Sequence, residues 1–307
     1  MIDAFSSSTL GPGIRVTNGD VEIVAATGFG PRIVRFAFPE GDNALGEWPD
    51  LSTDTALGRW RPRGGHRLWF APETMPESYA PDDAPVEHRS DGSLSLTVSR
   101  RTDAAGIGKE ITVTLPATGA EATLTHRITN RGPRPVTAAA WALTIVSRGG
   151  VALLPSEPWR SHDDALDAAR PFVLWSFTEL ADPRWEFGPR SVLLRSDAAR
   201  PAPQKAGAGN TRGWCACLWK ESLFVKRFDH LRGARYPDFG CNNEIYAAGN
   251  YMELESLGVL AELSPGASVE HKERWSLHQT ALEKEAGECS AEELESAIER
   301  AAPELFG

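Results

Sequence analysis

The sequence of 307 residues predicts an all-β protein whose antiparallel strands pack as a two-sheet sandwich. Short runs of strand-like composition fill the first three quarters of the chain, separated by Gly, Pro, Asn and Asp. Residues 111, 113 and 115 are apolar and alternate with polar neighbours, which predicts one strand face in the core and one in solvent or a cleft. The predicted strands are 14–16, 21–25, 33–38, 94–98, 107–115, 122–129 and 136–146.

The end of the chain predicts a short helix instead. Ser290 and Glu293 form the pattern of a capping box, and the helix is expected to run to about Ala301. Residues 156–182 interrupt the strand pattern and predict a long excursion, whereas 198–209, rich in Ala, Pro and Gly, predict a mobile surface loop. We see no repeat or linker, so we expect one carbohydrate-binding domain over residues 1–307.

Composition and charge exclude several classes of function. A net charge of -10 and a pI near 5.3 argue against a nucleic-acid partner or an anionic membrane surface. The sequence has no apolar run long enough to span a membrane and no secretory signal, so we expect a cytoplasmic protein. Cys215 and Cys217 lie in an apolar run with no second pair at zinc spacing, which predicts reduced thiols and no metal site. Ten Trp favour a sugar ligand, because flat rings stack on pyranoses.

The segment 251–258 carries the strongest functional signal. Strict alternation places Tyr251, Glu253 and Glu255 on one face of a strand, with apolar residues on the other. Two carboxylates beside an aromatic ring are costly in a packed core. We therefore expect this face to line a wet functional cleft, although an exposed acidic strand has the same pattern.

A second group of candidates follows the Gly64-Gly65 pair. Alternation places His66 on one face of the next strand and Arg67 with Trp69 on the other. Arg67 is a candidate anchor for a sugar or a phosphate, because its forked guanidinium donors suit both. Glu73 follows at the exit of the strand and is expected beside the cleft.

A third group of polar residues precedes the acidic strand. The candidates are Lys226, Tyr236, Asp238 and Glu244, of which Asp238 lies in a Pro-Asp-Phe-Gly stretch with turn chemistry. A polar turn without function is the alternative interpretation. Side chains of these types converge readily on a polyhydroxylated ligand, so we predict that they bind substrate.

Taken together, these segments resemble the galactose mutarotase-like proteins, including the aldose 1-epimerases, up to about residue 277. The resemblance is to an uncharacterised branch with Gly-Gly-x-Arg-Leu-Trp-x-Ala-Pro-Glu and Glu-Leu-Glu signatures. Leu254-Glu255-Ser256 stands where that family has a Leu-Glu-Thr strand with the catalytic glutamate, followed by a Pro-Gly turn at 264–266. The resemblance implies an antiparallel β-supersandwich and a sugar mutarotase that uses Glu255 as general base, with no cofactor. Lys226 or Arg67 could keep that carboxylate ionised.

One departure concerns the acid of such a reaction. Aldose mutarotases have a Thr-Pro-x-Asn-Leu-Thr-Asn-His strand whose histidine protonates the ring oxygen, and the comparable stretch 134–141 ends in Trp141. An indole cannot serve as that acid, so His66 is the candidate, with His126 as a second choice. Trp141 itself is expected to contact the substrate.

Two other functions stay open on this reasoning. A glycoside hydrolase or lyase on the same scaffold would need a pair of carboxyls across the bond, for which Glu73 with Glu255 is the better pair. A non-catalytic sugar-binding protein would keep the cleft and lack the acid. Trp141 favours binding, whereas Glu255 favours an enzyme.

Overall fold

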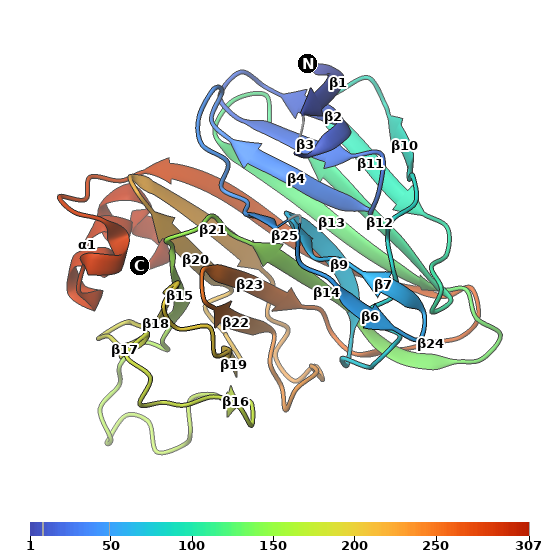
Figure 1. Ribbon diagram of the computed structural model, residues 1–307. Helices are drawn as coiled ribbons and strands as arrows, with labels where there is room; N and C mark the ends of the chain where they lie inside the picture. The colour runs from blue at the N-terminus through green and yellow to red at the C-terminus, as the bar shows by residue number, and fades with distance from the viewer. Residues whose placement is uncertain (8, 49, 307) are drawn as a thin grey trace.

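Two large antiparallel sheets face each other in the computed structural model, which describes residues 1–7, 9–48 and 50–306 (Figure 1). The predicted all-β fold is confirmed, because each predicted strand coincides with a strand of one of these sheets. In spatial order, the first sheet consists of β1 (Ile2–Ser7), β2 (Gly11–Thr17), β3 (Glu22–Ala26), β4 (Arg32–Ala37), β9 (His66–Ala71), β14 (Val136–Ile145), β23 (Tyr251–Leu257), β22 (Asn243–Ala248), β19 (Gln204–Ala208) and β16 (Phe172–Leu174), with β24 (Ala261–Leu263) paired to β14.

The second sheet packs on the inner face of the first. In spatial order it consists of β10 (Glu87–Ser90), β11 (Ser95–Arg100), β12 (Ile107–Thr114), β13 (Glu121–Asn130), β25 (Ser268–Gln279), β21 (Ser222–Phe228), β20 (Trp214–Trp219), β15 (Val151–Pro155), β18 (Ser191–Arg195) and β17 (Trp185–Phe187). Two short ladders join β5 (Glu47–Trp48) to β8 (Arg63–Gly64) and β6 (Thr53–Thr55) to β7 (Gly58–Trp60).

The main hydrophobic core lies between the two sheets. Leu68 and Leu254 reach it from the first sheet, and Phe224 and Trp275 reach it from the second. Phe224 and Trp275 meet edge to face, with ring centroids 5.2 Å apart. Each such side chain contributes about 1.5–3 kcal/mol when fully buried. The same strands therefore have one face in this core and a second face turned away from it.

The C-terminal helix covers the outer face of the second sheet. Helix α1 (Ala291–Ala301) begins at the predicted capping box, in which Ser290 and Glu293 each bond the backbone of the other. Leu294 and Ile298 pack in the cluster that covers this sheet. Two short 3-10 turns, η1 (Ala286–Glu288) and η2 (Pro303–Leu305), flank the helix.

Of the two irregular regions that the composition predicts, the structure confirms one and corrects the other. The excursion at 156–182 is indeed largely irregular, and its one strand is β16. The prediction of a mobile loop at 198–209 is wrong, because residues 204–208 form the fully buried strand β19 beside β22. Gly207 explains the small residues, since a Cβ there would lie 2.7 Å from Cys241 Sγ.

No helix in the part of the chain that the structure describes is long and apolar enough to cross a membrane. The four cysteines are free and buried, as predicted. Burial raises the pKa of the Cys215 thiol to about 12, so this thiol is poorly reactive at neutral pH.

Candidate functional site

The candidate site lies on the outer face of the first sheet, where β9, β14 and β23 are neighbours. Arg67, Leu143 and Glu255 stand side by side across these strands. Their neighbours in sequence, His66, Thr144 and Leu254, point to the opposite face, because side chains alternate along a strand. The predicted alternation of both strands is confirmed.

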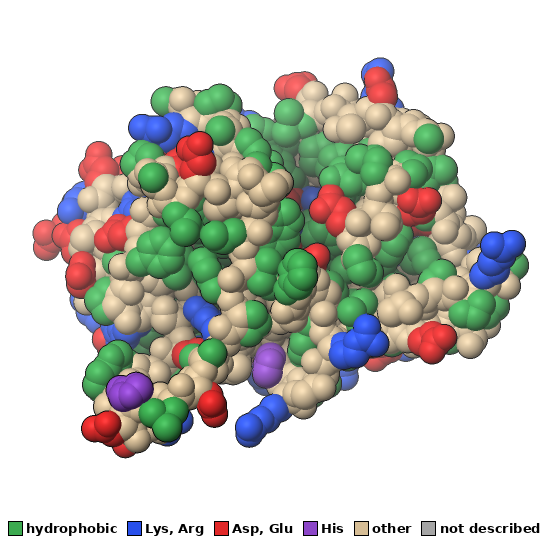
Figure 2. All heavy atoms as spheres, turned by 90° about the horizontal axis from the view of Figure 1, so that it is seen from below, with side chains coloured by type: hydrophobic (Ala, Val, Ile, Leu, Met, Phe, Trp, Pro, Cys, Tyr) green, Lys and Arg blue, Asp and Glu red, His purple; other side chains and the backbone are tan. Residues whose placement is uncertain are grey.

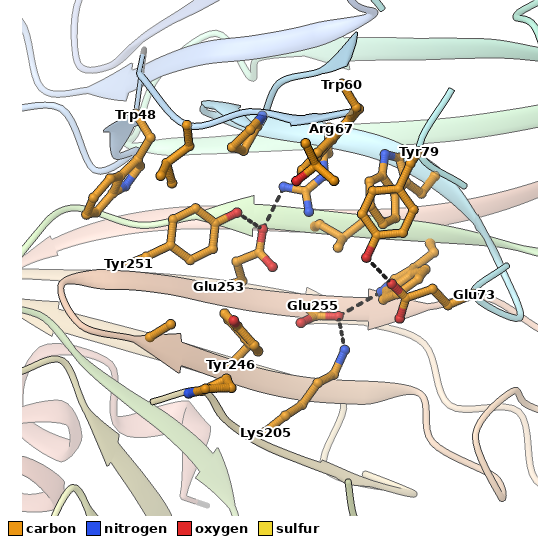
Figure 3. A pocket seen from close by; sticks show the side chains of 18 of the residues that line it. Trp48, Trp60, Arg67, Glu73, Tyr79, Lys205, Tyr246, Tyr251, Glu253 and Glu255 are labelled. Atoms are coloured by element: carbon orange, nitrogen blue, oxygen red, sulfur yellow. Dashed lines mark hydrogen bonds and ion pairs between the residues drawn. The ribbon is translucent and has the colours of Figure 1, made fainter. Parts of the chain in front are cut away.

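A pocket of about 560 Å³ opens on this face, a volume ordinary for a small-molecule site. Figure 2 shows the molecule from the side on which β6 and β16 lie in Figure 1, with hydrophobic side chains gathered across its middle. Rings from strands and loops surround the pocket, as Figure 3 shows for several of them. Among the rings that line it are those of Trp48, Trp60, Trp69, Trp141, Trp175 and Tyr246.

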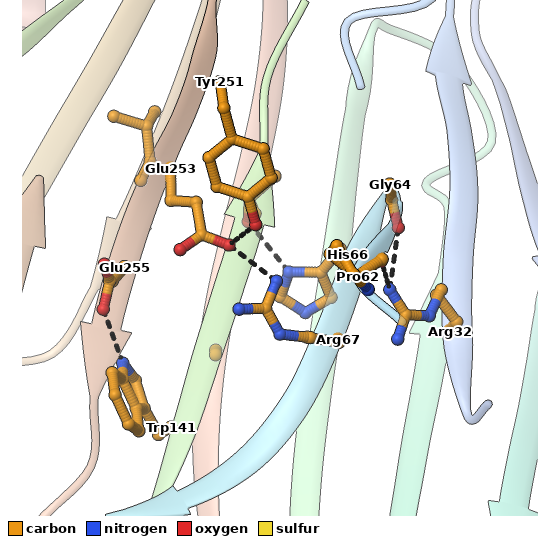
Figure 4. Close-up of polar contacts among 12 residues, drawn as sticks. Arg32, Pro62, Gly64, His66, Arg67, Trp141, Tyr251, Glu253 and Glu255 are labelled. Carbon is orange, nitrogen blue, oxygen red and sulfur yellow. Dashed lines mark hydrogen bonds and ion pairs between the residues drawn. The ribbon is translucent and has the colours of Figure 1, made fainter. Parts of the chain in front are cut away.

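Arg67, Glu253 and Tyr251 form a charged group at one end of the pocket (Figures 3 and 4). Glu253 Oε1 accepts hydrogen bonds from Arg67 at 2.6 Å and from the Tyr251 hydroxyl at 2.6 Å. The guanidinium also lies over the Trp69 ring, 4.6 Å from its centroid. Burial lowers the pKa of Arg67, but the charges and hydrogen bonds of Glu253 and Tyr251 together outweigh burial and raise this pKa. Arg67 is thus already paired and is not a free anchor for an anion.

Glu255 lies at the floor of the pocket and is 1% exposed. Its Oε2 accepts a hydrogen bond from Trp141 Nε1 at 2.9 Å and one from Lys205 Nζ at 2.9 Å. Its Oε1 has no hydrogen-bond partner in the described part of the chain. Burial raises the pKa of Glu255, and the Lys205 ammonium opposes this shift.

Lys205 also contacts Glu244, which lies directly beside Glu255 on the neighbouring strand β22. Lys205 Nζ is 2.7 Å from Glu244 Oε2, and the ammonium lies over the rings of Trp141 and Trp175 at 4.9 and 4.6 Å. Glu244 is fully buried and does not line the pocket itself. Burial raises the pKa of Glu244 well above its ordinary value, although Lys205 opposes the shift.

Two further tyrosines line the pocket. The Tyr79 hydroxyl donates a hydrogen bond to Glu73 at 2.5 Å, so Glu73 is beside the cleft as predicted. The Tyr246 hydroxyl bonds no group that the structure describes within the chain. Burial raises the pKa of Tyr246 to about 12, and the charges of Glu253 and Glu255 add to the effect.

His66 does not reach the pocket, which corrects its prediction as an acid on the substrate. Its ring, labelled in Figure 4, is fully buried between the sheets. There Nε2 bonds His126 Nε2 at 2.7 Å and Nδ1 bonds Thr144 Oγ1 at 2.8 Å. Burial lowers the pKa of His66 well below its ordinary value, so this imidazole stays neutral. The alternation that turns Arg67 outward turns His66 inward.

Lys226 is also in the space between the sheets rather than in the pocket. Its ammonium lies 2.9 Å from Glu273 Oε1 and donates hydrogen bonds to the carbonyl oxygens of Ala142 and Leu254. Lys226 therefore has no contact with Glu255, and the lysine that pairs with Glu255 is Lys205.

The remaining candidates from the polar segment lie outside the pocket lining. The Tyr236 hydroxyl accepts a hydrogen bond from the Leu231 backbone and its ring stacks on His230, which is a structural arrangement. Asp238 has a left-handed backbone with φ of 48° and interacts with buried Glu244. Burial raises the pKa of Asp238.

Several pocket residues were not among the sequence candidates. Lys205 lies in a segment whose composition predicts a loop, and Trp48, Trp60, Trp175 and Tyr246 come from strands or loops with no motif of their own. The excess of Trp in the whole chain is the one signal that could have indicated the three tryptophans, and no signal indicated Lys205 or Tyr246.

No family model matches the sequence, and no curated protein matches it. Solved structures share its fold. A galactose mutarotase-like protein from Lactobacillus casei superposes with a TM-score of 0.53 at 13% identity, covering 87% of this chain and 100% of that chain. Another from Clostridium acetobutylicum gives a TM-score of 0.51 at 9% identity, covering 91% of this chain and 98% of that chain.

A TPR-domain containing protein from Parabacteroides distasonis also matches, with a TM-score of 0.54 at 13% identity. The match covers 89% of this chain and 48% of that chain, so this chain spans about half the length of that protein. These likenesses confirm the predicted fold as that of galactose mutarotase-like proteins. The Gly-Gly and Glu-Leu-Glu signatures stay predictions.

Proposed function

We propose that this protein binds a carbohydrate in the pocket and interconverts the anomers of a sugar, with Glu255 as general base. The observation that carries the proposal is Glu255 Oε1, a carboxylate oxygen without a partner at the floor of an aromatic pocket. A buried polar atom without a hydrogen bond costs free energy, so it calls for a donor from a ligand. A sugar hydroxyl is such a donor.

The aromatic walls support a sugar as the ligand. Trp60, Trp69 and Trp141 form a chain of edge-to-face contacts, with ring centroids 5.3 and 5.6 Å apart. Ring faces bind the apolar faces of a pyranose, while carboxylates accept hydrogen bonds from its hydroxyls. Arg67 and Lys205 are each paired with carboxylates, which favours a neutral sugar over a phosphorylated or acidic one.

In the proposed reaction Glu255 Oε1 takes the proton of the anomeric hydroxyl as the bond from C1 to the ring oxygen breaks. The C1 carbonyl forms, and an acid delivers a proton to the ring oxygen. After rotation about the bond next to C1, the ring closes on the other carbonyl face and both protons return. We assign the acid role to Tyr246, because its hydroxyl lines the pocket and is not engaged by another group of the described chain.

One observation favours a second candidate, a sugar-binding protein without catalysis. The indole of Trp141, at the place of the family's acid histidine, donates its hydrogen bond to Glu255. Such a contact stabilises the carboxylate without supplying a proton. The same pocket would then hold the sugar through stacking and hydrogen bonds alone.

Glu255→Gln tests the proposal. The amide keeps the shape of the side chain and removes the base, so the anomerisation rate should fall by about 10²–10⁴-fold while sugar binding persists. Exchange NMR or polarimetry with a panel of neutral sugars measures the rate, and a thermal-shift assay measures binding. Glu262→Gln, on an exposed position of β24, is the matched control.

Other outcomes separate the alternatives. A wild-type protein that binds a sugar without interconverting it is a binding protein, and an unchanged rate in Glu255→Gln removes this residue from catalysis. Release of a free sugar from a glycoside would instead support the hydrolase, with Glu73 and Glu255 as its carboxyls.

A further inference from the structure

One lysine serves two buried carboxylates at the floor of the pocket. Glu244 and Glu255 are direct neighbours on adjacent strands, and each places an oxygen within 3 Å of Lys205 Nζ. Both carboxyl groups are almost completely shielded from water. A single ammonium can balance one negative charge, so the second carboxylate would be left unbalanced in a medium that penalises buried charge.

The surroundings of Glu244 make the excess of negative charge larger. Lys205 faces it from β19, Glu255 faces it from β23, and Asp238 and Cys241 face it from the loop before β22. Among these described neighbours Lys205 is the one cation. A proton on one of the carboxyls removes the imbalance, as in other sites where two carboxyls share a small space.

The hydrogen bonds give the same indication independently of charge. Glu244 Oε1 and Glu255 Oε1 are both buried without a partner among the described residues. Two deprotonated carboxylates offer only acceptors, so they cannot satisfy each other. A carboxylic acid proton on Glu244 supplies a donor to one lone pair of Glu255 Oε1, and the second lone pair of that oxygen stays open to a ligand hydroxyl.

We propose that Glu244 and Glu255, the two carboxyls that contact Lys205, carry a single proton together. The proton is on Glu244 and the negative charge is on Glu255. This inference rests on the proposed function in one respect, because it makes Glu244 the residue that keeps the base ionised. Glu244 is a positioning residue here, since it lies behind the pocket wall and does not line the pocket. Glu255 is then ready to accept a proton from a hydroxyl at neutral pH.

Infrared difference spectroscopy tests the proposal on the wild-type protein without any sugar. A protonated buried carboxyl gives a C=O stretch well separated from that of a carboxylate. We expect this band at pH 7 in wild type, its loss in Glu244→Gln, and its retention in Asp238→Asn and in the exposed control Glu262→Gln. Circular dichroism and thermal melting show whether each variant is folded.

Two results would overturn the proposal. The first is absence of the band from wild type at pH 7, a measurement that does not depend on any variant being folded. The second is loss of the band in Asp238→Asn together with its retention in Glu244→Gln. The spectrum does not depend on turnover, so it separates the two proposals. A band that belongs to Glu244 in a protein that neither binds nor converts sugars would refute the function alone, and sugar conversion without the band would refute the shared proton alone.

Discussion

Two buried clusters of charged residues lie back to back across the first sheet, and they differ in how completely they are satisfied. The pocket cluster consists of Arg67, Lys205, Glu244, Glu253 and Glu255 on the outer face. The inter-sheet cluster consists of His66, His126, Lys226, Ser256, His271 and Glu273. Both contain an ammonium and a carboxylate at hydrogen-bond distance, so residue type alone does not separate them.

The hydrogen bonds of the inter-sheet cluster can all be assigned. Glu273 accepts from Lys226, Ser256 and Trp275, and His126 Nδ1 donates to the His271 carbonyl oxygen. Because that carbonyl can only accept, His126 Nε2 must accept the proton of His66 Nε2. His66, His126 and Glu273 are spaced as metal ligands could be, yet these bonds already use their atoms.

The pocket cluster, in contrast, keeps unsatisfied oxygens on Glu244 and Glu255. A fully satisfied buried network fixes the packing of a core, whereas unmet hydrogen-bonding capacity beside a cavity indicates a ligand or a proton. The comparison therefore favours a structural role for the inter-sheet cluster and a ligand-binding role for the pocket cluster.

The largest expected effect is on Lys226. Lys226→Met leaves Glu273 as an unpaired buried charge, and the free energy of unfolding should fall by about 3–5 kcal/mol. Lys205→Met should cost less stability, since Glu244 and Glu255 can take up protons instead. Urea denaturation of both variants, with exposed Lys220→Met as control, measures the difference. A larger loss for Lys205→Met than for Lys226→Met would contradict this division of roles.

Removal of the Tyr246 hydroxyl should affect turnover and not stability. If this phenol is the acid, Tyr246→Phe lowers the anomerisation rate by about 10²-fold or more. Tyr79→Phe is the control, because it removes a phenol of the same pocket that is bonded to Glu73. Equal rates for Tyr246→Phe and wild type would leave the acid role to another group.

The two clusters should respond to pH with opposite signs. Burial lowers the pKa of His271 to about 3. Between pH 6.5 and 3 this histidine is therefore protonated in the unfolded chain and neutral in the folded protein. Stability is thus lost as pH falls through this window, by about 2 kcal/mol at pH 5 for this residue. Burial raises the pKa values of Glu244 and Glu255. Above the ordinary pKa of a glutamate, the folded protein therefore holds protons that the unfolded chain has released, and stability falls as pH rises.

Denaturation at pH 7 and pH 5 checks these signs. His271→Gln should lose less stability on acidification than wild type does. Glu244→Gln should lose more, because its opposing contribution is gone. Identical pH dependence in all three proteins would show that neither cluster couples its protons to folding.

A smaller effect is expected for Trp141. Trp141→Phe keeps an aromatic ring and removes the hydrogen bond to Glu255, which should raise the pKa of that carboxyl. A hydrogen bond to a charged group contributes about 1.5–3 kcal/mol, so the rate at neutral pH should fall by about 10- to 10²-fold. Trp69→Phe, at the paired position on β9, is the matched control. A fall of the same size in Trp69→Phe would point to stacking as the cause.

The sequence predicted the division of faces on β9 and β23 because strand alternation is a local property. Alternation alone separates Arg67 from His66 and puts Glu253 and Glu255 on one face. Placing the two strands in one cleft also required the family resemblance. The choice of His66 as acid failed for a related reason. Alternation separates His66 from Arg67, but it does not say which of the two faces lies between the sheets.

Lys205 could not be predicted, because its surroundings are not local. The strand that carries it is short and rich in Ala and Gly, and it is a strand because β22 and β16 flank it. Cys241 and Trp175 lie so close to position 207 that only Gly fits there, and Gly has a low strand propensity. Lys226 was preferred for its polar neighbours, yet its register on β21 directs it to Glu273.

The strict alternation on β9 and β23 also has a consequence for protein engineering. Library diversity placed at positions 67, 69, 253 and 255 would remodel the pocket while the inward positions 66, 68, 252 and 254 preserve the packing. A selection for folded protein alone should therefore accept substitutions at the outward positions more often than at the inward ones. Arg67 and Glu253 should change together, because a buried charge without its partner is costly. A selection for ligand should tolerate neither set. The spacing of tolerated substitutions would read out the orientation of each strand without a further structure.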